Sequence, residues 1–479
     1  MSAEGNPLKC CRQNFTNMAC KSRTLSTKPP NPLSLSFLAD KCITIDHLKQ
    51  LHTQMIISTR ITDPFAASRL LSSSALSPFR DLTYASRIFS SIHHPNTFMW
   101  NTLIRAHASG PHPRHSLTLY INMRRLGALP GKHTFPFLLK ACSNLRCFRA
   151  CEQVHSHVLK FGLGSDLHVV NGLVRGHCVS GNLAGARFLF DGMTERSLSL
   201  WTTMICGYAQ ELWSDEALAL FNEMIVEGFE PNGAALASVL SACARSGCLE
   251  LGERIHEHMR VKGFEVGVIL GTALIYMYAK NGAIVMARKL FDEMNERNIV
   301  TWNAMISGLA AHGHVEEALT LFEKLKKEKV VVPNDVTFIG ILSACCHAGL
   351  IDIGRSIFDS MKTVYGIEPK IEHYGCLVDL LGRGGKLLEA EELIKGMPWK
   401  ADVVILGAML AASKNNGNTK VAERVVKEIL TLEPHNHGVH VALSNMYAEA
   451  GQWQEVLRLR KVMKKDRLKK APGWSLVAA

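Results

Sequence analysis

Histidines close to acidic residues are the side chains of this chain whose types could support metal chemistry. His314, Val315 and Glu316 form an H-x-E motif, the spacing at which zinc-dependent deaminases hold a metal ligand and a proton-transferring glutamate. Those enzymes also require a P-C-x-x-C motif, and no C-x-x-C occurs in the 479 residues. Because His314 also falls where a helix is expected to begin, we interpret the motif as a helix start.

The other residues that could bind a metal or take part in catalysis also lack the partner residues that these roles require. The histidine pairs His155/His157 and His256/His258 have no cysteine at zinc-ligand spacing. The sequence contains no G-x-x-x-x-G-K-[ST] phosphate-binding loop and no recognisable arrangement of serine, histidine and aspartate for nucleophilic catalysis. We therefore expect a chain that is not an enzyme and that uses no metal or other cofactor.

A long internal period organises the chain that carries these residues. Trp100, Trp201 and Trp302 are 101 residues apart, and each begins a similar segment: WNTLIRAHAS, WTTMICGYAQ and WNAMISGLAA. Each 101-residue block divides into two longer units of equal length and one shorter unit. The units of the first two blocks are Thr97–Gly131, Lys132–Asp166, Leu167–Ser197, Leu198–Asn232, Gly233–Gly267 and Val268–Asn298. A fixed period of this length predicts a stack of repeats, each of which buries its apolar face on its neighbours.

The repeat Ile299–Asn334 indicates which elements one unit contains. A first helix is expected to begin near Trp302 and to end before Gly313, which suits the turn. A second helix should begin near Val315. Its buried face, at i, i+3, i+4, i+7 spacing, should consist of Ala318, Leu321, Phe322 and Leu325. Two helices of this size are stable only when stacked, so the sequence predicts an all-α fold, a right-handed α-solenoid superhelix of helical hairpins with a concave groove.

Composition limits the partners that such an array can bind. The chain has 54 Lys and Arg against 42 Asp and Glu, a formal net charge of +12, which favours a polyanionic partner such as nucleic acid. No stretch of 18 or more apolar residues exists, so we expect no membrane partner. Cys142, Cys243 and Cys345 recur in matching contexts of successive repeats, and we interpret them as small buried residues in a reducing compartment.

The first residues have a composition of their own. Residues 1–36 contain five Lys and Arg against the single acid Glu4, many Ser and Thr, and three prolines at their end. A basic, hydroxyl-rich and acid-poor N-terminus is typical of an organellar transit peptide, which we assign to residues 1–34. The alternative is a tail without a targeting role.

The repeats resemble a known family of helical hairpins. The repeat ends GFEPN (228–232) and GIEP (366–369), and the cores FNEMIVEGFEPN and FDEMNERN, are similar to those of pentatricopeptide repeat (PPR) proteins, and the resemblance covers residues 35 to about 470. The alternation of longer and shorter units resembles the plant PLS subfamily, whose long, short and standard repeats occur in triplets. Tetratricopeptide repeats, which are helical hairpins of similar length and bind peptides, are the alternative.

The resemblance extends to the C-terminal part of the chain. The string IEHYGCLVDLLGRGGKLLEAEELIKGMP (371–398) is typical of the last repeat of this subfamily. The segments Val403–Asn436 and His437–Lys470 resemble the paired E-type motifs that follow it. The resemblance therefore implies about 11 repeats over residues 35–402, E-type motifs over 403–470 and a C-terminal stub over 471–479, in an E-type subgroup that lacks a DYW deaminase domain.

In this family the fifth residue of a repeat's first helix and the last residue of the repeat face one RNA base. Uracil and guanine present a ring N–H, which suits the acceptor Asp, whereas adenine and cytosine present a ring acceptor, which suits a donor such as Asn or Ser. At the fifth position the family links Asn with pyrimidines and Thr or Ser with purines. The resemblance thus implies the pairs Ser68/Asn96 for A, Asn101/Gly131 for a pyrimidine, Asn171/Ser197 for C, Thr202/Asn232 and Thr272/Asn298 for A, and Asn303/Asn334 for a pyrimidine.

Some repeats depart from the pattern or allow a simpler interpretation. Gly131 offers no side-chain donor. The pairs that give little indication of a base are Pro136/Asp166, Ala237/Gly267, Ile339/Lys370 and Gly375/Asp402. For every polar pair the alternative role is capping of a helix start, where Asn, Thr and Ser are common.

Three functions remain open from the sequence. Relatives with E-type motifs recruit a deaminase in trans, so the resemblance implies a sequence-specific single-stranded RNA-binding protein that directs C-to-U editing of an organellar transcript. Its partners are then organellar RNA, a DYW-type cytidine deaminase and organellar editing factors, and we favour the mitochondrion over the chloroplast. The alternatives are splicing, stabilisation or translation of an organellar RNA and, from another class, a protein-binding scaffold. If the family register holds, the final short repeat lies four nucleotides upstream of the edited C.

Overall fold

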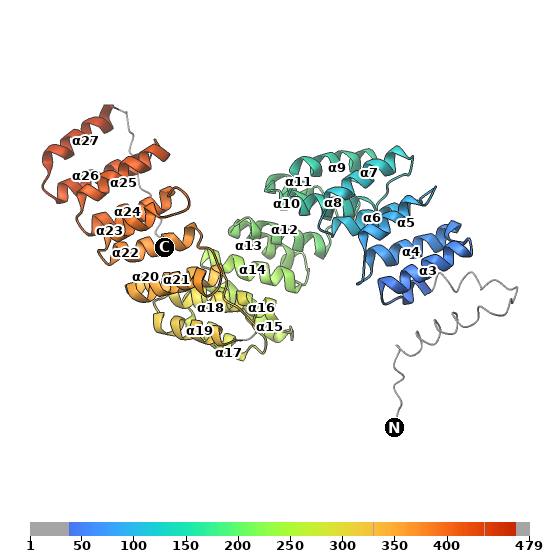
Figure 1. Cartoon of the computed structure of the whole chain (residues 1–479), viewed down its shortest axis with the longest axis horizontal. Coiled ribbons are helices and arrows are strands. Elements are labelled where there is room, and N and C mark those ends of the chain that lie inside the picture. The colour runs from blue at the N-terminus through green and yellow to red at the C-terminus, as the bar shows by residue number, and fades with distance from the viewer. Residues whose placement is uncertain (1–37, 329, 435, 466–479) are drawn as a thin grey trace, which may run out of the picture. The chain divides into compact units, whose positions relative to one another are not determined.

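The structure of the chain is a computed structural model that describes residues 38–328, 330–434 and 436–465. Within these ranges every regular element is a helix and no strand occurs, which confirms the all-α prediction (Figure 1). The transit peptide assigned to residues 1–34 and the stub at 471–479 lie outside the described residues. No helix in the described ranges combines the length and the apolar character that crossing a membrane requires.

Helices alternate as the first and second members of hairpins. The first helices are α4 (Pro64–Leu76), α6 (Thr97–Ala108), α8 (Phe135–Asn144), α10 (Leu167–Val179), α12 (Leu198–Gln210), α14 (Gly233–Ser246), α16 (Val268–Lys280), α18 (Ile299–Ala311), α20 (Asp335–Ala348), α22 (Ile371–Arg383), α24 (Val403–Asn415) and α26 (His437–Glu449). The second helices are α5 (Leu82–Ser90), α7 (Arg114–Arg125), α9 (Phe148–Lys160), α11 (Leu183–Asp191), α13 (Ser214–Val226), α15 (Leu249–Val261), α17 (Ile284–Glu293), α19 (Val315–Lys327), α21 (Ile351–Thr363), α23 (Leu387–Lys395), α25 (Thr419–Leu432) and α27 (Trp453–Lys465). The helix α3 (Ile45–Ile57) and the short 3₁₀ helix η1 (Arg60–Thr62) precede α4.

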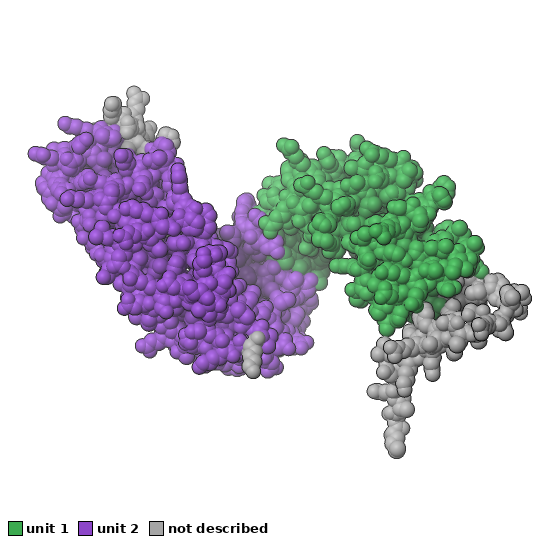
Figure 2. Space-filling view, viewed as in Figure 1, with its two compact units in different colours: residues 1–207 green, residues 208–479 purple. Residues whose placement is uncertain are grey.

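The hairpins form two compact units, residues 1–207 and residues 208–479 (Figure 2). The boundary falls inside α12, close to its C-terminal end. Within each unit, first helices pack on their hairpin partners and on the first helices of neighbouring repeats. This arrangement is the stack of hairpins that the internal period predicts.

The tryptophans that mark the period pack against the preceding repeat. Each packs edge-to-face on a phenylalanine of the preceding second helix, a favourable aromatic geometry. The pairs, with the distances between ring centroids, are Phe89–Trp100 (4.6 Å), Phe190–Trp201 (4.8 Å) and Phe291–Trp302 (5.1 Å). The regular spacing of the tryptophans therefore reflects one recurring contact between a second helix and the next first helix.

The first helix of the repeat Ile299–Asn334 starts earlier than its apolar pattern predicts. We expected a start near Trp302, whereas α18 begins at Ile299. The reason is the cap: Asn298 Oδ1 accepts a hydrogen bond from Thr301 N at 3.0 Å, and Asn298 N donates to Thr301 Oγ1 at 3.3 Å. This capping box stabilises a turn ahead of the tryptophan.

The second helix of the same repeat follows the prediction closely. It begins at Val315, and the four residues of its predicted apolar face expose at most 3% of their surface: Ala318, Leu321, Phe322 and Leu325. The turn before it contains Gly313 with a φ of 80°, a left-handed conformation that glycine adopts without strain. Leu212 takes the equivalent place one block of three repeats earlier, with a φ of 66° and a side chain that is 70% exposed.

Candidate nucleic-acid interface

The last residue of most repeats caps the first helix of the next. In each case a side-chain oxygen accepts a hydrogen bond from a backbone N–H in the first turn. The contacts are Asn96 with Met99 N (2.9 Å), Ser197 with Leu200 N (3.3 Å), Asn232 with Ala235 N (3.0 Å), Asn298 with Thr301 N (3.0 Å) and Asn334 with Thr337 N (3.1 Å). The capping role that we considered as the alternative is therefore present in the structure.

Capping also determines how each asparagine amide is oriented. A backbone N–H can only donate, so the amide atom that faces it must be the oxygen. The NH₂ group of the same amide then points away from that N–H. Each capping asparagine consequently keeps N–H donors on the side of the amide that does not face its helix, so capping and base reading by a donor are compatible.

Several fifth residues contact the beginning of the next first helix. Thr272 Oγ1 lies 2.7 Å from Thr301 Oγ1, and Asn171 Nδ2 donates to Ser199 Oγ at 2.8 Å. These bonds join residues that are 29 and 28 positions apart in the sequence. The stack thus places the fifth residue of one repeat beside the N-terminus of the following first helix.

Asn303 and Asn334 form the most complete of these networks. Asn303 Nδ2 donates to Asn334 Oδ1 at 3.0 Å, and the Thr337 hydroxyl donates to Asn303 Oδ1 at 2.6 Å. Asn303 is only 7% exposed. Because Asn334 Oδ1 already accepts from Asn303 and Thr337, the Asn334 NH₂ is the polar group of this pair that remains to meet a ligand.

The remaining predicted positions differ in how far they are engaged. Ser68 on α4 is buried, and the Thr202 hydroxyl donates to Leu198 O at 2.8 Å within its own helix. The Oδ1 atoms of Asn101 and Asn171 are buried, and neither has a hydrogen-bond partner within the described part of the chain. A buried acceptor without a partner is costly, so each of these two amides carries an unmet hydrogen bond.

Gly131 N donates to Thr134 Oγ1 at 3.0 Å, as Asn298 N donates to Thr301 Oγ1, but Gly131 has no side chain that could cap the next helix. The first helix of its neighbour, α8, begins at Phe135 and not at Lys132, because residues 131–134 form a turn in which Thr134 N donates to Gly131 O at 2.8 Å. Pro136 is consequently the second residue of α8. The equal repeat lengths in the sequence do not reveal this shift.

Three of the four repeats whose pairs indicate no base end in a cap or an ion pair, and the fourth ends in Gly267, which has no side chain for either. Asp166 and Asp402 accept from backbone N–H groups of α10 and α24. Lys370 instead forms an ion pair with Asp335, and the hydrogen bond from Lys370 holds the pKa of the Asp335 carboxyl below its usual value. The Lys370 ammonium is therefore already engaged in the absence of a ligand.

A row of exposed apolar side chains was not predicted from the sequence. They occupy the second position of first helices, one turn before the fifth residue, and each is between 47% and 77% exposed. They are Phe65 and Phe98 in the first unit, and Ile269, Val300, Val336 and Val404 in the second. Apolar residues that stay exposed at one recurring position indicate a contact surface. The signal in the sequence was an apolar residue beside the cap, where the packing of the helix does not require one.

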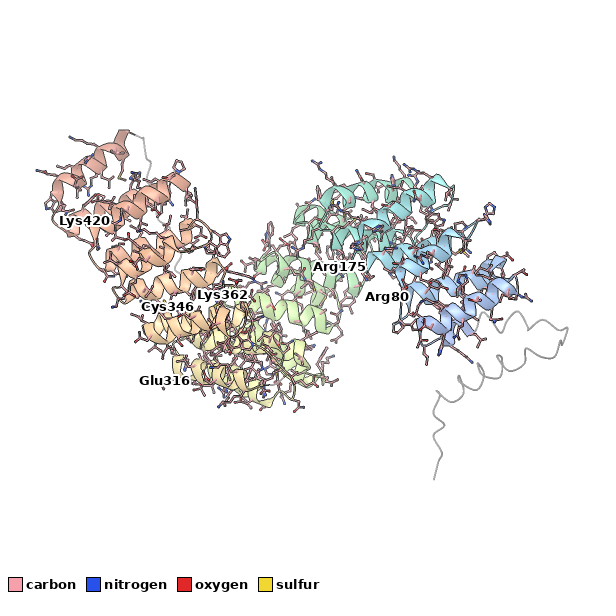
Figure 3. All side chains as sticks on the ribbon, in the orientation of Figure 1. Arg80, Arg175, Glu316, Cys346, Lys362 and Lys420 are labelled. Atoms are coloured by element: carbon pink, nitrogen blue, oxygen red, sulfur yellow. The ribbon has the colours of Figure 1, made fainter. Side chains whose placement is uncertain are left out.

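The histidine motifs are part of the structural framework. His314 is the N-cap residue of α19, and Glu316 lies in its first turn (Figure 3). His157 Nδ1 lies 2.8 Å from Tyr120 Oη, and His256 Nδ1 lies 3.0 Å from Tyr278 Oη. Among the residues that the structure describes, no group of three His, Cys, Asp or Glu is arranged to hold a metal ion.

The recurring cysteines have the buried positions that the sequence predicts. Cys142, Cys243 and Cys345 expose at most 1% of their surface. Burial raises the pKa of the Cys142 and Cys243 thiols to about 12 and that of the Cys345 thiol to about 11. The thiols therefore stay protonated near neutral pH, and their role is packing.

The fold and this site define a helical-repeat protein whose first helices present polar and apolar side chains at their N-terminal ends. Family models agree with that class. A PPR repeat model matches residues 168–198, 199–229, 237–264, 272–299, 336–364 and 372–400, a PPR repeat family model matches 297–347, and an E motif model matches 416–478.

Two plant proteins are similar to the chain over most of its length. Pentatricopeptide repeat-containing protein At5g56310 of Arabidopsis thaliana is 40% identical over 466 residues, covering 90% of this chain and 87% of the relative. At1g59720 of the same plant, named chloroplastic/mitochondrial, is 40% identical over 457 residues, covering 92% and 71%. The chain belongs to the pentatricopeptide repeat family, and its repeats and E motif place it in the E-type subgroup of the plant PLS class.

Solved structures of one PPR protein have a similar fold. The crystal structure of pentatricopeptide repeat protein PPR10 from maize is similar with a TM-score of 0.57 and 19% identity, over 97% of this chain. PPR10 in complex with an 18-nt psaJ RNA element gives a TM-score of 0.60 and 19% identity, over 96% of this chain. The chain spans about two thirds of the length of these PPR10 chains, 67% and 66%. At this identity the likeness concerns the fold.

Proposed function

We propose that the chain is a sequence-specific single-stranded RNA-binding protein that acts as the site-recognition factor for C-to-U editing of an organellar RNA. The observation that carries the RNA-binding part is the recurring arrangement at the start of first helices. There the NH₂ group of a capping Asn points away from the N–H that its oxygen caps, and a polar fifth residue lies next to the helix start, as in Asn303 and Asn334. This is the geometry that reading the Watson–Crick edge of one base per repeat requires.

The exposed apolar row supports the same function. A base whose edge contacts the polar pair can pack its face against the side chain of the second residue of a first helix. Val300 and Ile269 are two such residues, and they are 56% and 75% exposed. Stacking of this kind tolerates any base and supplies affinity, while the polar pair supplies specificity. The net charge of +12 favours the phosphate backbone, and PPR10 of the same family has been crystallised with RNA.

A binding experiment with the full chain tests this part of the proposal. The polar pairs predict the target 5′-A-Y-N-C-A-N-A-Y-N-N, where Y is a pyrimidine and N is any base. Fluorescence anisotropy with this RNA and with a scrambled RNA of the same composition should give clearly tighter binding to the ordered sequence. Equal affinity for both would refute the base assignments.

The editing part of the proposal rests on the E motif at residues 416–478. The described part of this tail has apolar side chains that its own helices do not cover: on α27, Trp453 is 63% exposed and Leu457 is 62% exposed. They lie four residues apart and so share one helix face. We propose that this face contacts a DYW-type cytidine deaminase that is supplied in trans. The name of At1g59720 supports a location in an organelle without a choice between the two.

The double variant W453A/L457A tests the recruiting role. It should abolish editing of the target in complemented null-mutant plants, while the affinity for RNA stays unchanged. The matched control is L388A, because Leu388 on α23 is also exposed, at 72%. If W453A/L457A restores editing in full, the tail face does not recruit the deaminase. Loss of splicing or of transcript stability in the null mutant, with normal editing, would point to the alternative RNA functions.

A further inference from the structure

A segment of the first unit lacks acidic residues entirely. Residues 82–151 contain nine Lys and Arg and six His, but no Asp or Glu. The segment includes α5, α6, α7 and α8. A run of this length with charges of one sign gives the surface a positive potential that attracts anions.

A pocket of about 810 Å³ opens within this segment, between α5, α7 and the turn that joins α6 to α7. The residues that could contact an anion there are one arginine, three histidines and four hydroxyl residues. They are Arg87, His107, His112, His115, Thr83, Ser86, Ser90 and Thr118. No carboxylate lines the pocket, whereas three other pockets in the described part of the chain contain Glu423, Glu265 and Asp292.

Two nitrogen-containing side chains of this pocket lack partners of their own, whereas the Ser86 hydroxyl donates to Leu82 O at 2.8 Å and the Ser90 hydroxyl donates to Ser86 O at 2.9 Å. Among the described residues the Arg87 side chain has neither an ion pair nor a hydrogen bond, and His107 Nδ1 is buried without a partner. The ring centroid of His115 lies 5.4 Å from that of His107 and 5.8 Å from that of His112. Burial, followed by the charges of His115 and His112, lowers the pKa of His107. Three imidazoles this close repel one another when protonated, and a bound anion removes that repulsion.

In two other short repeats, an ion pair lies at the equivalent position of the second helix. On α11, Arg187 pairs with Asp191 at 2.8 Å, and on α17, Arg288 pairs with Asp292 at 2.9 Å. The equivalent positions on α5, counted from the phenylalanine that packs on the tryptophan, are Ser86 and Ser90. The first short repeat has thus exchanged an internal ion pair for two hydroxyls, with Arg87 as the unpaired cation.

We propose that this pocket binds a phosphate group, through Arg87, the imidazole N–H groups of His107, His112 and His115, and the neighbouring hydroxyls. Arginine is a strong donor to phosphate oxygens, and an imidazole N–H adds a further hydrogen bond. Within the described residues the histidines are not arranged as metal ligands. The charged groups that face the pocket are Arg87 from α5, His107 from α6, His112 from the turn and His115 from α7. The nearest acid in the sequence, Asp81, caps α5 by accepting from Tyr84 N at 2.9 Å.

The phosphate is supplied by the RNA backbone on the 5′ side of the bases that are read. The acid-free segment is long enough to contact several successive phosphates of an RNA strand, whereas a small anion would contact the pocket alone. The pocket is separate from the base-reading positions, because His107 lies six residues beyond Asn101 on α6, roughly 9 Å along the helix axis. The source of the phosphate rests on the proposed RNA binding, whereas the phosphate site itself does not.

The site is tested first without RNA. The ³¹P line width of inorganic phosphate is titrated with the full chain at pH 6.0 and at pH 8.0. We expect tighter binding at pH 6.0 than at pH 8.0, because a bound anion favours the protonated form of a neighbouring imidazole. R87Q should weaken it about tenfold, and R149Q should not, because Arg149 is an exposed residue of the same acid-free segment on α9. Circular dichroism verifies that both variants are folded. Equal binding by the wild type and R87Q would overturn the proposal.

The second arm identifies the source. The affinity for the ten-nucleotide target is compared with that for the same RNA carrying a five-nucleotide 5′ extension, at several salt concentrations. The extension should raise the affinity of the wild type and of R149Q but not of R87Q, and R87Q should lower the slope of log K against log salt by about 0.7, as expected for one lost phosphate contact on a single strand. Phosphate binding without an effect of the extension would overturn the RNA source in favour of a small phosphate ligand. Failure of the base assignments alone leaves the ³¹P result unaffected.

Discussion

Exchange of Asn334 for aspartate changes the base preference of one repeat without removing its cap. In the protein, Asn334 Oδ1 accepts from Thr337 N at 3.1 Å and from Asn303 Nδ2 at 3.0 Å. A carboxylate oxygen can accept both bonds, and the second oxygen then stands where the NH₂ group was. The group that faces the ligand therefore changes from a donor to an acceptor. Since Asn303 favours pyrimidines, we expect N334D to prefer U over C at the eighth base of the target.

The size of this effect follows from general values for base recognition. A well-formed pair of contacts discriminates between bases by about 1–3 kcal/mol, a factor of roughly 5 to 150 in the ratio of the two affinities. The free energy of unfolding should change little, because Asn and Asp are about equally good N-caps. A negative charge at the first turn of α20 adds about 0.3–1 kcal/mol of stability at low salt.

The assay compares two RNAs that differ only in C or U at that base, by anisotropy with the wild type and N334D. The matched control is N418D, because Asn418 caps α25 in the same way, accepting from Val421 N at 3.1 Å, but belongs to a second helix. A folded N334D that keeps the preference for C would refute the reasoning, since the cap would then be the whole role of Asn334.

Three further predictions concern surface, turn and pH. V300D should weaken RNA binding about tenfold, on the order of 1 kcal/mol, because the face of a base is proposed to pack against the exposed Val300 side chain. L212G should raise the free energy of unfolding by about 1 kcal/mol, as measured by urea denaturation, because Leu212 has a φ of 66° that costs a side chain about that much. Thermal stability should fall as the pH drops from 8 towards 5.5, because burial lowers the pKa of six histidines in the folded protein. The unfolded chain then binds more protons, so their stabilising contribution is present above about pH 6.5 and is lost below it.

Each of these predictions has its control. V285D places the same charge on a residue of α17 that is 87% exposed, and it should leave RNA affinity unchanged. G313L should destabilise the protein for the reason that L212G stabilises it, and a loss of stability in L212G would contradict the strain argument. A melting temperature that rises between pH 8 and pH 5.5 would contradict the assignment of neutral, buried histidines.

The sequence alone determined the fold class and the layout of the repeats. The spacing of Trp100, Trp201 and Trp302 revealed the period, and local apolar spacing identified the buried face of α19 down to Leu325. These features are local, because a helix needs only its own sequence to set which residues share a face. The family resemblance supplied the positions at which base reading is proposed, and the sequence also places them at helix starts.

The tertiary structure decided what those positions contact. The bond from Asn303 to Asn334 spans 31 residues, and the contact of the Arg87 pocket with His107 and His115 joins two repeats. Periodicity within a helix cannot specify such contacts, because they depend on how neighbouring hairpins stack. The late start of α8 at Phe135 and the strained φ of Leu212 likewise arise from the chain path between packed helices. Burial across the stack, and not local spacing, determines which polar groups are already bonded and which remain available to a ligand.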